Sequence, residues 1–175
     1  RTIFLRSEAN CAVFPEEGHP PMSVEEWLKV LRTYQSYGVN CVRFHSHCPP
    51  EAAFEAADQL GILLQPELSC WNPNDAFLSE EEFLYYQTEL KELLQHYANH
   101  PSFVMLTFGN ELQTTKEGHS RMREMLETAH KIDRTRLIAD GSNNHYGAEG
   151  YEKESDFYTA QNYLDKPLRG IFAGM

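Results

Sequence analysis

An amide and a carboxylic acid stand side by side where an apolar run of the sequence ends. Residues 103–108 are almost continuously apolar, Gly109 interrupts the run, and Asn110 and Glu111 follow directly. A carboxyl group in such a position can donate or accept a proton during a reaction, and a planar amide can bind a hydroxyl group. The pair therefore indicates acid/base chemistry on a ligand that is rich in hydroxyl groups.

Polar side chains that suit the same kind of ligand follow the other strand-like segments. They comprise carboxylates, amides, imidazoles and a guanidinium, which bind hydroxyl groups, and aromatic rings, which stack on the apolar faces of sugars. The candidates that accompany Glu111 are Asn10, Arg43, His45, His47, Glu67, Trp71, Asn110, Asn143 and Tyr163. These residues can act together only if the fold brings the ends of many strands to one rim.

Strand-like and helix-like segments alternate along the chain, which is the pattern such a fold requires. Helical periods begin at capping boxes, Ser23 with Glu26 and Ser79 with Glu82, and short apolar runs separate them. We expect strands at residues 3–5, 39–44, 62–64, 103–108, 137–139 and 157–160. We expect helices within residues 23–38, 50–61, 79–97 and 121–132.

Alternating apolar strands and amphipathic helices indicate a parallel sheet that is covered by helices. Six predicted strands fit either an open doubly wound sheet or an incomplete (β/α)8 barrel. The sequence contains neither G-x-G-x-x-G nor G-x-x-x-x-G-K-[ST], the usual signs of a nucleotide-binding sheet. Its polar residues gather directly after the strands, at the ends that form the active-site face of a barrel. We therefore predict an α/β fold, a partial (β/α)8 TIM barrel with about six of its eight strands.

The amino-acid composition of the chain excludes several classes of binding partner. The 175 residues include 26 acidic and 15 basic side chains, for a net charge of −11, which repels nucleic acid and anionic membrane surfaces. The hydrophobic fraction of 41% excludes a disordered chain. The four cysteines form no C-x-x-C pair, which argues against a zinc ribbon. We expect no nucleic-acid partner, no membrane partner, no cofactor and no metal.

Four stretches in the same order resemble glycoside hydrolase family 2, the β-galactosidase, β-glucuronidase and β-mannosidase group. Residues 100–111 read HPSFVMLTFGNE and are similar to the family's fourth-strand motif, H-P-S-[VI]-x-x-[WF]-x-x-G-N-E. Phe4-Leu5-Arg6 leading to Asn10 resembles the first-strand motif. Residues 38–43 resemble the second-strand motif, and residues 58–67 resemble the third.

The resemblance implies a retaining hydrolase of O-glycosides that acts on terminal sugars of oligo- or polysaccharides. It implies Glu111 as the general acid/base, Asn110 as the amide that holds the sugar's 2-hydroxyl, and Arg43 as the cation that supports the catalytic carboxylates. Tyr163 would be the aromatic hydroxyl near the nucleophile. In this mechanism two carboxyl groups stand about 5.5 Å apart.

The family's nucleophile is a glutamate after the seventh strand, and no residue here matches that motif. We therefore expect residues 1–175 to be a single catalytic-barrel segment cut from a longer multidomain chain, inactive by itself. Its partners would be a carbohydrate substrate, the remaining barrel strands and flanking β-sandwich domains. The compartment stays open, with a periplasmic or secreted location favoured over a cytoplasmic one.

Two other interpretations stay open. The chain could be a barrel that binds carbohydrate without catalysis. It could instead be a metal-dependent hydrolase that uses His45 and His47, with His145 as a further ligand. It is also open which of His45 and His47 lines the pocket. Glu67 could support another residue or contact the substrate, and Trp71 could stack on a sugar or pack within its loop.

Overall fold

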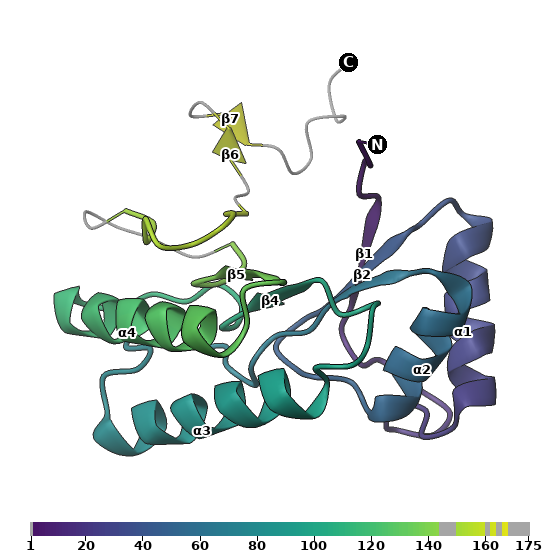
Figure 1. Cartoon of the computed structure of the whole chain (residues 1–175), viewed down its shortest axis with the longest axis horizontal. Helices are drawn as coiled ribbons and strands as arrows, with labels where there is room; N and C mark the ends of the chain where they lie inside the picture. Colours follow the sequence, from purple (N-terminus) through teal and green to yellow (C-terminus); the bar gives the residue numbers. More distant parts are fainter. Residues whose placement is uncertain (1, 144–149, 160–161, 164–165, 168–175) are drawn as a thin grey trace.

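Strands and helices alternate strictly over the first 139 residues (Figure 1). The structure is a computed structural model, and it describes residues 2–143, 150–159, 162–163 and 166–167. The elements are β1 (Ser7–Asn10), α1 (Val24–Ser36), β2 (Cys41–Phe44), α2 (Glu51–Leu60), β3 (Leu63–Gln65), α3 (Glu80–His96), β4 (Met105–Thr107), α4 (Lys116–Ile132), β5 (Leu137–Ala139), β6 (Asn162–Tyr163) and β7 (Lys166–Pro167).

The first five strands are parallel and follow one another in sequence order. β1, β2 and β3 pair side by side, and β4 pairs with β5. Parallel bridges between Leu64 and Phe103 and between Glu67 and Thr107 connect β3 to β4. A doubly wound sheet reverses its strand order, whereas a barrel does not. The order is therefore that of a (β/α)8 barrel, and the four helices lie on one side of the strands (Figure 1).

A sixth strand position is marked by a single pair of residues. Thr159 forms a parallel bridge with Ser142, beyond the end of β5. The prediction of a strand at 157–160 is thus reduced to one bridge within residues 157–159, and residue 160 lies outside the described ranges. β6 and β7 pair with each other in antiparallel fashion, away from the parallel strands (Figure 1).

The first strand begins later than predicted. Residues 3–5 are exposed and lie before β1, which starts at Ser7 opposite Cys41. The Asn40 side chain donates to the Phe4 carbonyl at 2.9 Å and accepts from the Arg6 N–H at 2.7 Å. A side chain thus binds the backbone groups that a longer strand would use in its ladder.

The fourth helix begins five residues before the predicted start. Gly118 lies within its first turn, and glycine weakens a helical pattern in the sequence. The glycine has a packing reason, since a Cβ at this position would lie 1.8 Å from the Thr114 Oγ1 atom. Close contact with the preceding loop, rather than helix propensity, therefore explains this residue.

The serine caps of the two predicted capping boxes are confirmed. Ser23 accepts a hydrogen bond from the Glu26 N–H at the start of α1, and Ser79 accepts one from the Glu82 N–H at the start of α3. Each bond satisfies one of the backbone donors that a helix leaves free at its N-terminus. The starts of α1 and α3, two of the helices that cover the strands, are therefore determined by residues close in sequence.

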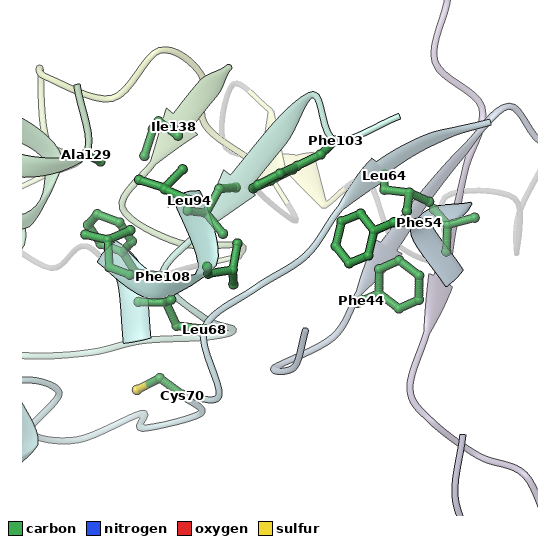
Figure 2. Packing of buried hydrophobic residues seen from close by; sticks show 14 of the residues in the cluster. Phe44, Phe54, Leu64, Leu68, Cys70, Leu94, Phe103, Phe108, Ala129 and Ile138 are labelled. Carbon is green, nitrogen blue, oxygen red and sulfur yellow. The ribbon is translucent and has the colours of Figure 1, made fainter. Parts of the chain in front are cut away.

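The hydrophobic core lies between the strands and the helices (Figure 2). Phe44 of β2 and Leu64 of β3 meet Phe54 of α2, and Leu94 of α3 lies near Phe108, which follows β4. All five side chains are buried. The packing of these side chains holds the ends of the strands in place, and with them the polar residues that follow each strand. None of the helices in the described part is long and apolar enough to cross a membrane.

Two of the cysteines are expected to resist alkylation in the folded protein. Burial raises the pKa of the Cys48 and Cys70 thiols to about 12. At pH 8 only about 10⁻⁴ of each thiol is ionised, and the thiolate is the reactive form. Exposed Cys11 should react with iodoacetamide in the folded protein, whereas Cys48 and Cys70 should react only after unfolding. The measurement is a peptide map of the alkylated protein at pH 8. Rapid native labelling of Cys70 would contradict this burial.

Candidate active site

The Gly109-Asn110-Glu111 segment follows β4 and is held between two neighbouring loops. The Asn110 N–H donates to the Cys70 carbonyl at 3.0 Å, in the loop after β3. The Glu111 N–H donates to the Ser142 carbonyl at 2.8 Å, in the loop after β5. Backbone bonds on both sides therefore fix the position of Glu111, the predicted acid/base residue, and of the amide before it.

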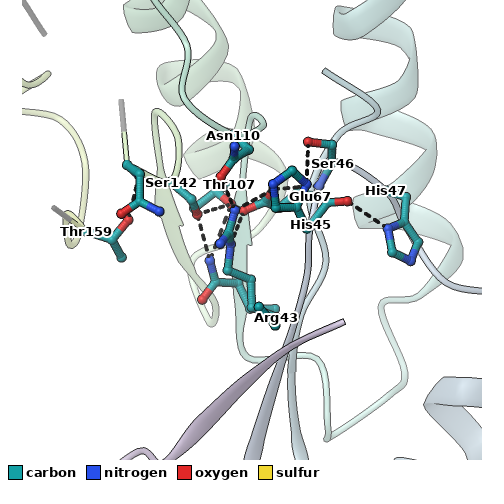
Figure 3. A network of polar contacts seen from close by, with 12 residues as sticks. Arg43, His45, Ser46, His47, Glu67, Thr107, Asn110, Ser142 and Thr159 are labelled. Carbon is teal, nitrogen blue, oxygen red and sulfur yellow. Dashed lines mark hydrogen bonds and ion pairs between the residues drawn. The ribbon is translucent and has the colours of Figure 1, made fainter. Parts of the chain in front are cut away.

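Arg43 of β2 connects this segment to β3 (Figure 3). Its Nε donates to Glu67 Oε1 at 2.6 Å, and its Nη2 lies 3.3 Å from Glu67 Oε2. The same Nη2 donates to Asn110 Oδ1 at 2.5 Å. One guanidinium thus orients both the buried carboxylate and the amide next to Glu111, which its rigid planar fork is suited to do.

Glu67 is completely buried and is surrounded by donors. Besides Arg43, the Ser46 N–H donates to Glu67 Oε2 at 2.7 Å, and the Thr107 hydroxyl donates to Oε1 at 3.0 Å. A buried carboxylate is stable only when it is paired and hydrogen-bonded in this way. Of the two roles left open for Glu67, the geometry favours support of Arg43 over contact with a substrate.

A layer of neutral polar side chains lies beside Glu67, and sequence reasoning missed it. Gln65 Nε2 is 3.2 Å from Ser142 Oγ and 3.4 Å from Thr107 Oγ1, and the two hydroxyls are 3.2 Å apart. All three residues are buried. The signal available was Gln65 two residues before Glu67, a spacing that places both on one face of a strand.

Glu111 is half-buried and lies beside an exposed aromatic ring. The Trp71 indole Nε1–H donates to Glu111 Oε2 at 3.2 Å, and 60% of Trp71 is exposed. The His45 ring packs edge-on against Trp71, with centroids 5.2 Å apart. The structure therefore brings Trp71 and His45 to Glu111.

The two predicted histidines point into different surroundings. The His47 ring packs edge-on against buried Phe44, and its Nδ1 lies 2.9 Å from the His45 carbonyl oxygen. Figure 3 shows His47 apart from the Arg43 network. Within the described ranges no three His, Cys, Asp or Glu side chains are grouped to hold a metal ion, and His145 lies outside those ranges. The described residues do not form the metal centre considered for His45 and His47.

Two predicted residues whose side chains are described, Asn10 and Asn143, are not brought into the network around Arg43. Buried Asn10 ends β1, and its Nδ2 donates to the Tyr34 hydroxyl of α1 at 3.2 Å. Asn143 lies beyond β5, where its N–H donates to Thr159 Oγ1 at 3.0 Å. Tyr163 belongs to β6, and its side chain is outside what the structure describes.

Left-handed backbone conformations gather after the strands. Ser46 follows β2 with φ 56°, Glu111 follows β4 with φ 51°, and Asn143 follows β5 with φ 55°. Non-glycine residues rarely adopt this conformation, which persists only where the surrounding structure holds it and is concentrated at functional sites. The strain supports a functional role for this rim.

Substitution of Gly109 by alanine is expected to disrupt the segment. Gly109 has φ 141°, and a Cβ there would lie 2.2 Å from the Cys70 carbonyl oxygen. Backbone strain and the clash together should cost about 3 kcal/mol of stability. Gly61→Ala is the matched control, since Gly61 also has positive φ but nothing within 4 Å. Thermal unfolding should show the larger loss for Gly109→Ala; equal losses would contradict the close approach.

Comparison with known proteins identifies the family. Residues 21–170 match the family described as "Glycosyl hydrolases family 2, TIM barrel domain". The chain belongs to glycoside hydrolase family 2. The predicted fold class is confirmed, and the described strands β2 to β5 lie within the residues that match the TIM barrel domain.

Two curated relatives of this chain are much longer than it is. It is 27% identical over 149 residues to a putative beta-glucuronidase of Formosa agariphila, covering 79% of this chain and 14% of that protein. It is 33% identical over 101 residues to a beta-galactosidase of Thermoanaerobacter pseudethanolicus, covering 57% of this chain and 13% of that protein. The chain thus spans about a seventh of the length of these relatives.

Solved structures show the same fold. The beta-glucuronidase of Parabacteroides merdae superposes with a TM-score of 0.71 at 20% identity, over 89% of this chain and 19% of that one. The GH2 beta-galacturonidase of Eisenbergiella tayi, bound to galacturonate, gives a TM-score of 0.68 at 18% identity, over 78% of this chain and 25% of that one.

Three residues in the stretches that resemble family 2 contact one another away from the rim. His100 Nδ1 lies 2.7 Å from Asp58 Oδ2, and the Ser102 N–H donates to Asp58 Oδ1 at 2.9 Å. Asp58 lies in α2, and the other two residues precede β4. These three residues therefore connect α2 to the segment before β4, whereas Asn110 and Glu111 lie at the rim.

Proposed function

We propose that this chain carries the acid/base half of the active site of a retaining glycosidase that removes terminal sugars. One observation carries the proposal. Arg43 reaches from β2 to bind the amide of Asn110, directly before Glu111 at the end of β4, while buried Glu67 holds Arg43 from behind. Family membership supports the assignment, because this segment is where the family 2 resemblance places the acid/base residue.

In the first step Glu111 donates its proton to the glycosidic oxygen as the bond to the anomeric carbon breaks. A second carboxylate attacks that carbon and forms a covalent glycosyl-enzyme. In the second step Glu111 takes a proton from water, which then hydrolyses the intermediate with net retention of configuration. The second carboxylate comes from outside residues 1–175, which form one segment of a longer multidomain protein.

Asn110 holds the sugar beside the proton donor. Its Oδ1 accepts from Arg43, so its amide nitrogen points the other way and donates to the sugar's 2-hydroxyl. This contact strengthens as charge develops on the sugar ring in the transition state. Arg43 also provides positive charge near the catalytic carboxylates. The fold holds this charge in place before the substrate binds, so no reorganisation is needed during the reaction.

The substrate is a glycoside of a hexose or a hexuronic acid, because relatives and structural neighbours are named beta-galactosidase, beta-glucuronidase and beta-galacturonidase. The remaining barrel strands and flanking β-sandwich domains are the partners that complete the site. The strand order here supports this, since β1 and the sixth strand position would close a barrel only with further strands.

The test is hydrolysis by the intact protein of a chromogenic panel of β-galactosides, β-glucuronides and β-galacturonides. NMR of the first-formed sugar should show the anomeric configuration of the substrate. Residues 1–175 alone serve as the inactive control. Inversion would contradict the retaining mechanism. Sugar binding by the intact protein with no hydrolysis of any member would favour the non-catalytic carbohydrate-binding barrel.

A further inference from the structure

Trp71 is an exposed aromatic residue with its one polar atom engaged. The other tryptophan, Trp27, is fully buried and donates its indole N–H to the Pro21 carbonyl at 2.7 Å. Trp71 leaves 60% of its surface exposed, yet its indole N–H donates to Glu111 Oε2. An amphipathic ring in this arrangement offers an apolar face to a ligand while its polar edge binds the protein.

The backbone on both sides of Trp71 is fastened to the backbone on both sides of Glu111. The Asn110 N–H donates to the Cys70 carbonyl, and the Gln113 N–H donates to the Asn72 carbonyl, both at 3.0 Å. The two loops can approach this closely because Gly109 has no side chain where Cys70 passes. The paired backbone therefore fixes the separation of the two loops from which the indole and the carboxyl extend.

The indole is also supported by His45. The His45 ring meets Trp71 edge-on at 84°, and His45 Nδ1 lies 3.1 Å from Ser46 Oγ. Ser46 in turn donates its N–H to buried Glu67. Trp71 is thus connected through His45 and Ser46 to the ion pair that holds Asn110.

We propose that Trp71 positions the carboxyl group of Glu111 and that its exposed face binds the leaving group of the glycoside. The inference rests on the proposed function. Because the Trp71 N–H donates to Glu111 Oε2, the acidic proton of Glu111 is favoured on Oε1. The oxygen that protonates the leaving group is therefore defined before the substrate binds. Glu111 must contact the glycosidic oxygen in order to protonate it. Because the Trp71 Nε1 atom lies 3.2 Å from Glu111 Oε2, the indole ring lies beside the leaving group.

The positioning role is tested with Trp71→Phe in the intact protein, which keeps a ring and removes the N–H. A phenyl leaving group needs protonation, whereas a 2,4-dinitrophenyl group leaves without it. We expect kcat/KM to fall about tenfold for the phenyl glycoside and to stay within about twofold for the dinitrophenyl glycoside. A merely structural role would lower both equally, and that result would overturn the positioning role.

The binding role is tested with Trp71→Ala and two substrates that need no acid. A 2,4-dinitrophenyl glycoside fills the proposed surface, whereas a glycosyl fluoride of the same sugar does not. We expect KM to rise about fivefold for the first and not for the second. Tyr37→Ala, at a highly exposed residue after α1, is the control and should change neither. Equal KM changes for both substrates would overturn the binding role.

Failure of this inference is distinguishable from failure of the proposed function. Glu111→Gln is assayed in parallel with the same leaving groups. If Glu111→Gln shows the dependence on leaving group and Trp71→Phe does not, only the role of Trp71 is wrong. If Glu111→Gln also hydrolyses the phenyl glycoside at the normal rate, both proposals are overturned.

Discussion

Glu111→Gln in the intact protein is expected to lower kcat/KM for a phenyl glycoside by about a thousandfold, since general acid catalysis typically contributes 10²- to 10⁴-fold. Glutamine has nearly the same shape and can still accept the Trp71 N–H, so the fold should be preserved. The same variant should form the glycosyl-enzyme from a 2,4-dinitrophenyl glycoside at close to the normal rate, because that leaving group needs no proton.

The second half of the reaction provides an internal check on this prediction. Without a general base at position 111, hydrolysis of the glycosyl-enzyme slows, and the intermediate should accumulate as a burst of dinitrophenolate. Added azide should restore turnover and yield a glycosyl azide with retained configuration. A variant that hydrolyses phenyl and dinitrophenyl glycosides with unchanged rates would contradict the role of Glu111.

Arg43→Met should be strongly destabilising. Glu67 is 0% exposed, and removal of its ion-pair partner leaves a buried carboxylate without a counter-charge. Breaking a buried pair in this way costs about 3 kcal/mol, which for a domain of this size lowers the apparent Tm by roughly 6–12 °C. The measurement is thermal unfolding of the intact protein.

A double variant separates the charge of Glu67 from its packing. Arg43→Met combined with Glu67→Gln removes both charges, so much of the lost stability should return. Activity should not return, because Asn110 has still lost the donor that orients its amide. If the double variant is less stable than Arg43→Met alone, the loss does not come from an unpaired Glu67.

Much of the fold could be predicted because its signals are local. The serine caps at Ser23 and Ser79 and the apolar stretch of β5 lie where the sequence places them. The start of the first strand was wrong because Ile3-Phe4-Leu5 has the apolar character of a strand, whereas the Asn40 side chain, distant in sequence, binds that backbone. The start of α4 was wrong because Gly118 looks unfavourable until its contact with Thr114 is known.

The candidate site could be predicted in type but not in arrangement. The Gly-Asn-Glu sequence after an apolar run identified Asn110 and Glu111, and their roles stay predictions until tested. The separation of His45 from His47 could not be read from the sequence, because it depends on the left-handed turn at Ser46 and on packing against Phe44. Such features arise from tertiary contacts rather than from residue spacing.

The buried layer beside Glu67 was missed for the same reason. Gln65, Thr107 and Ser142 come from three different strand regions, and each is unremarkable alone in its stretch. Their hydrogen bonds exist only when β3, β4 and the loop after β5 lie side by side. Only the i, i+2 spacing of Gln65 and Glu67 offered a local sign.

The proposed role of Glu111 is to donate its proton to the leaving oxygen at the rim formed after β2, β3 and β4. A crystal structure of intact Glu111→Gln with an unhydrolysed glycoside tests it most directly. We expect the glycosidic oxygen within about 3.2 Å of the side chain at position 111, and the 2-hydroxyl bound by Asn110. A glycoside bound elsewhere on the barrel, with its glycosidic oxygen out of reach of that side chain, would contradict it.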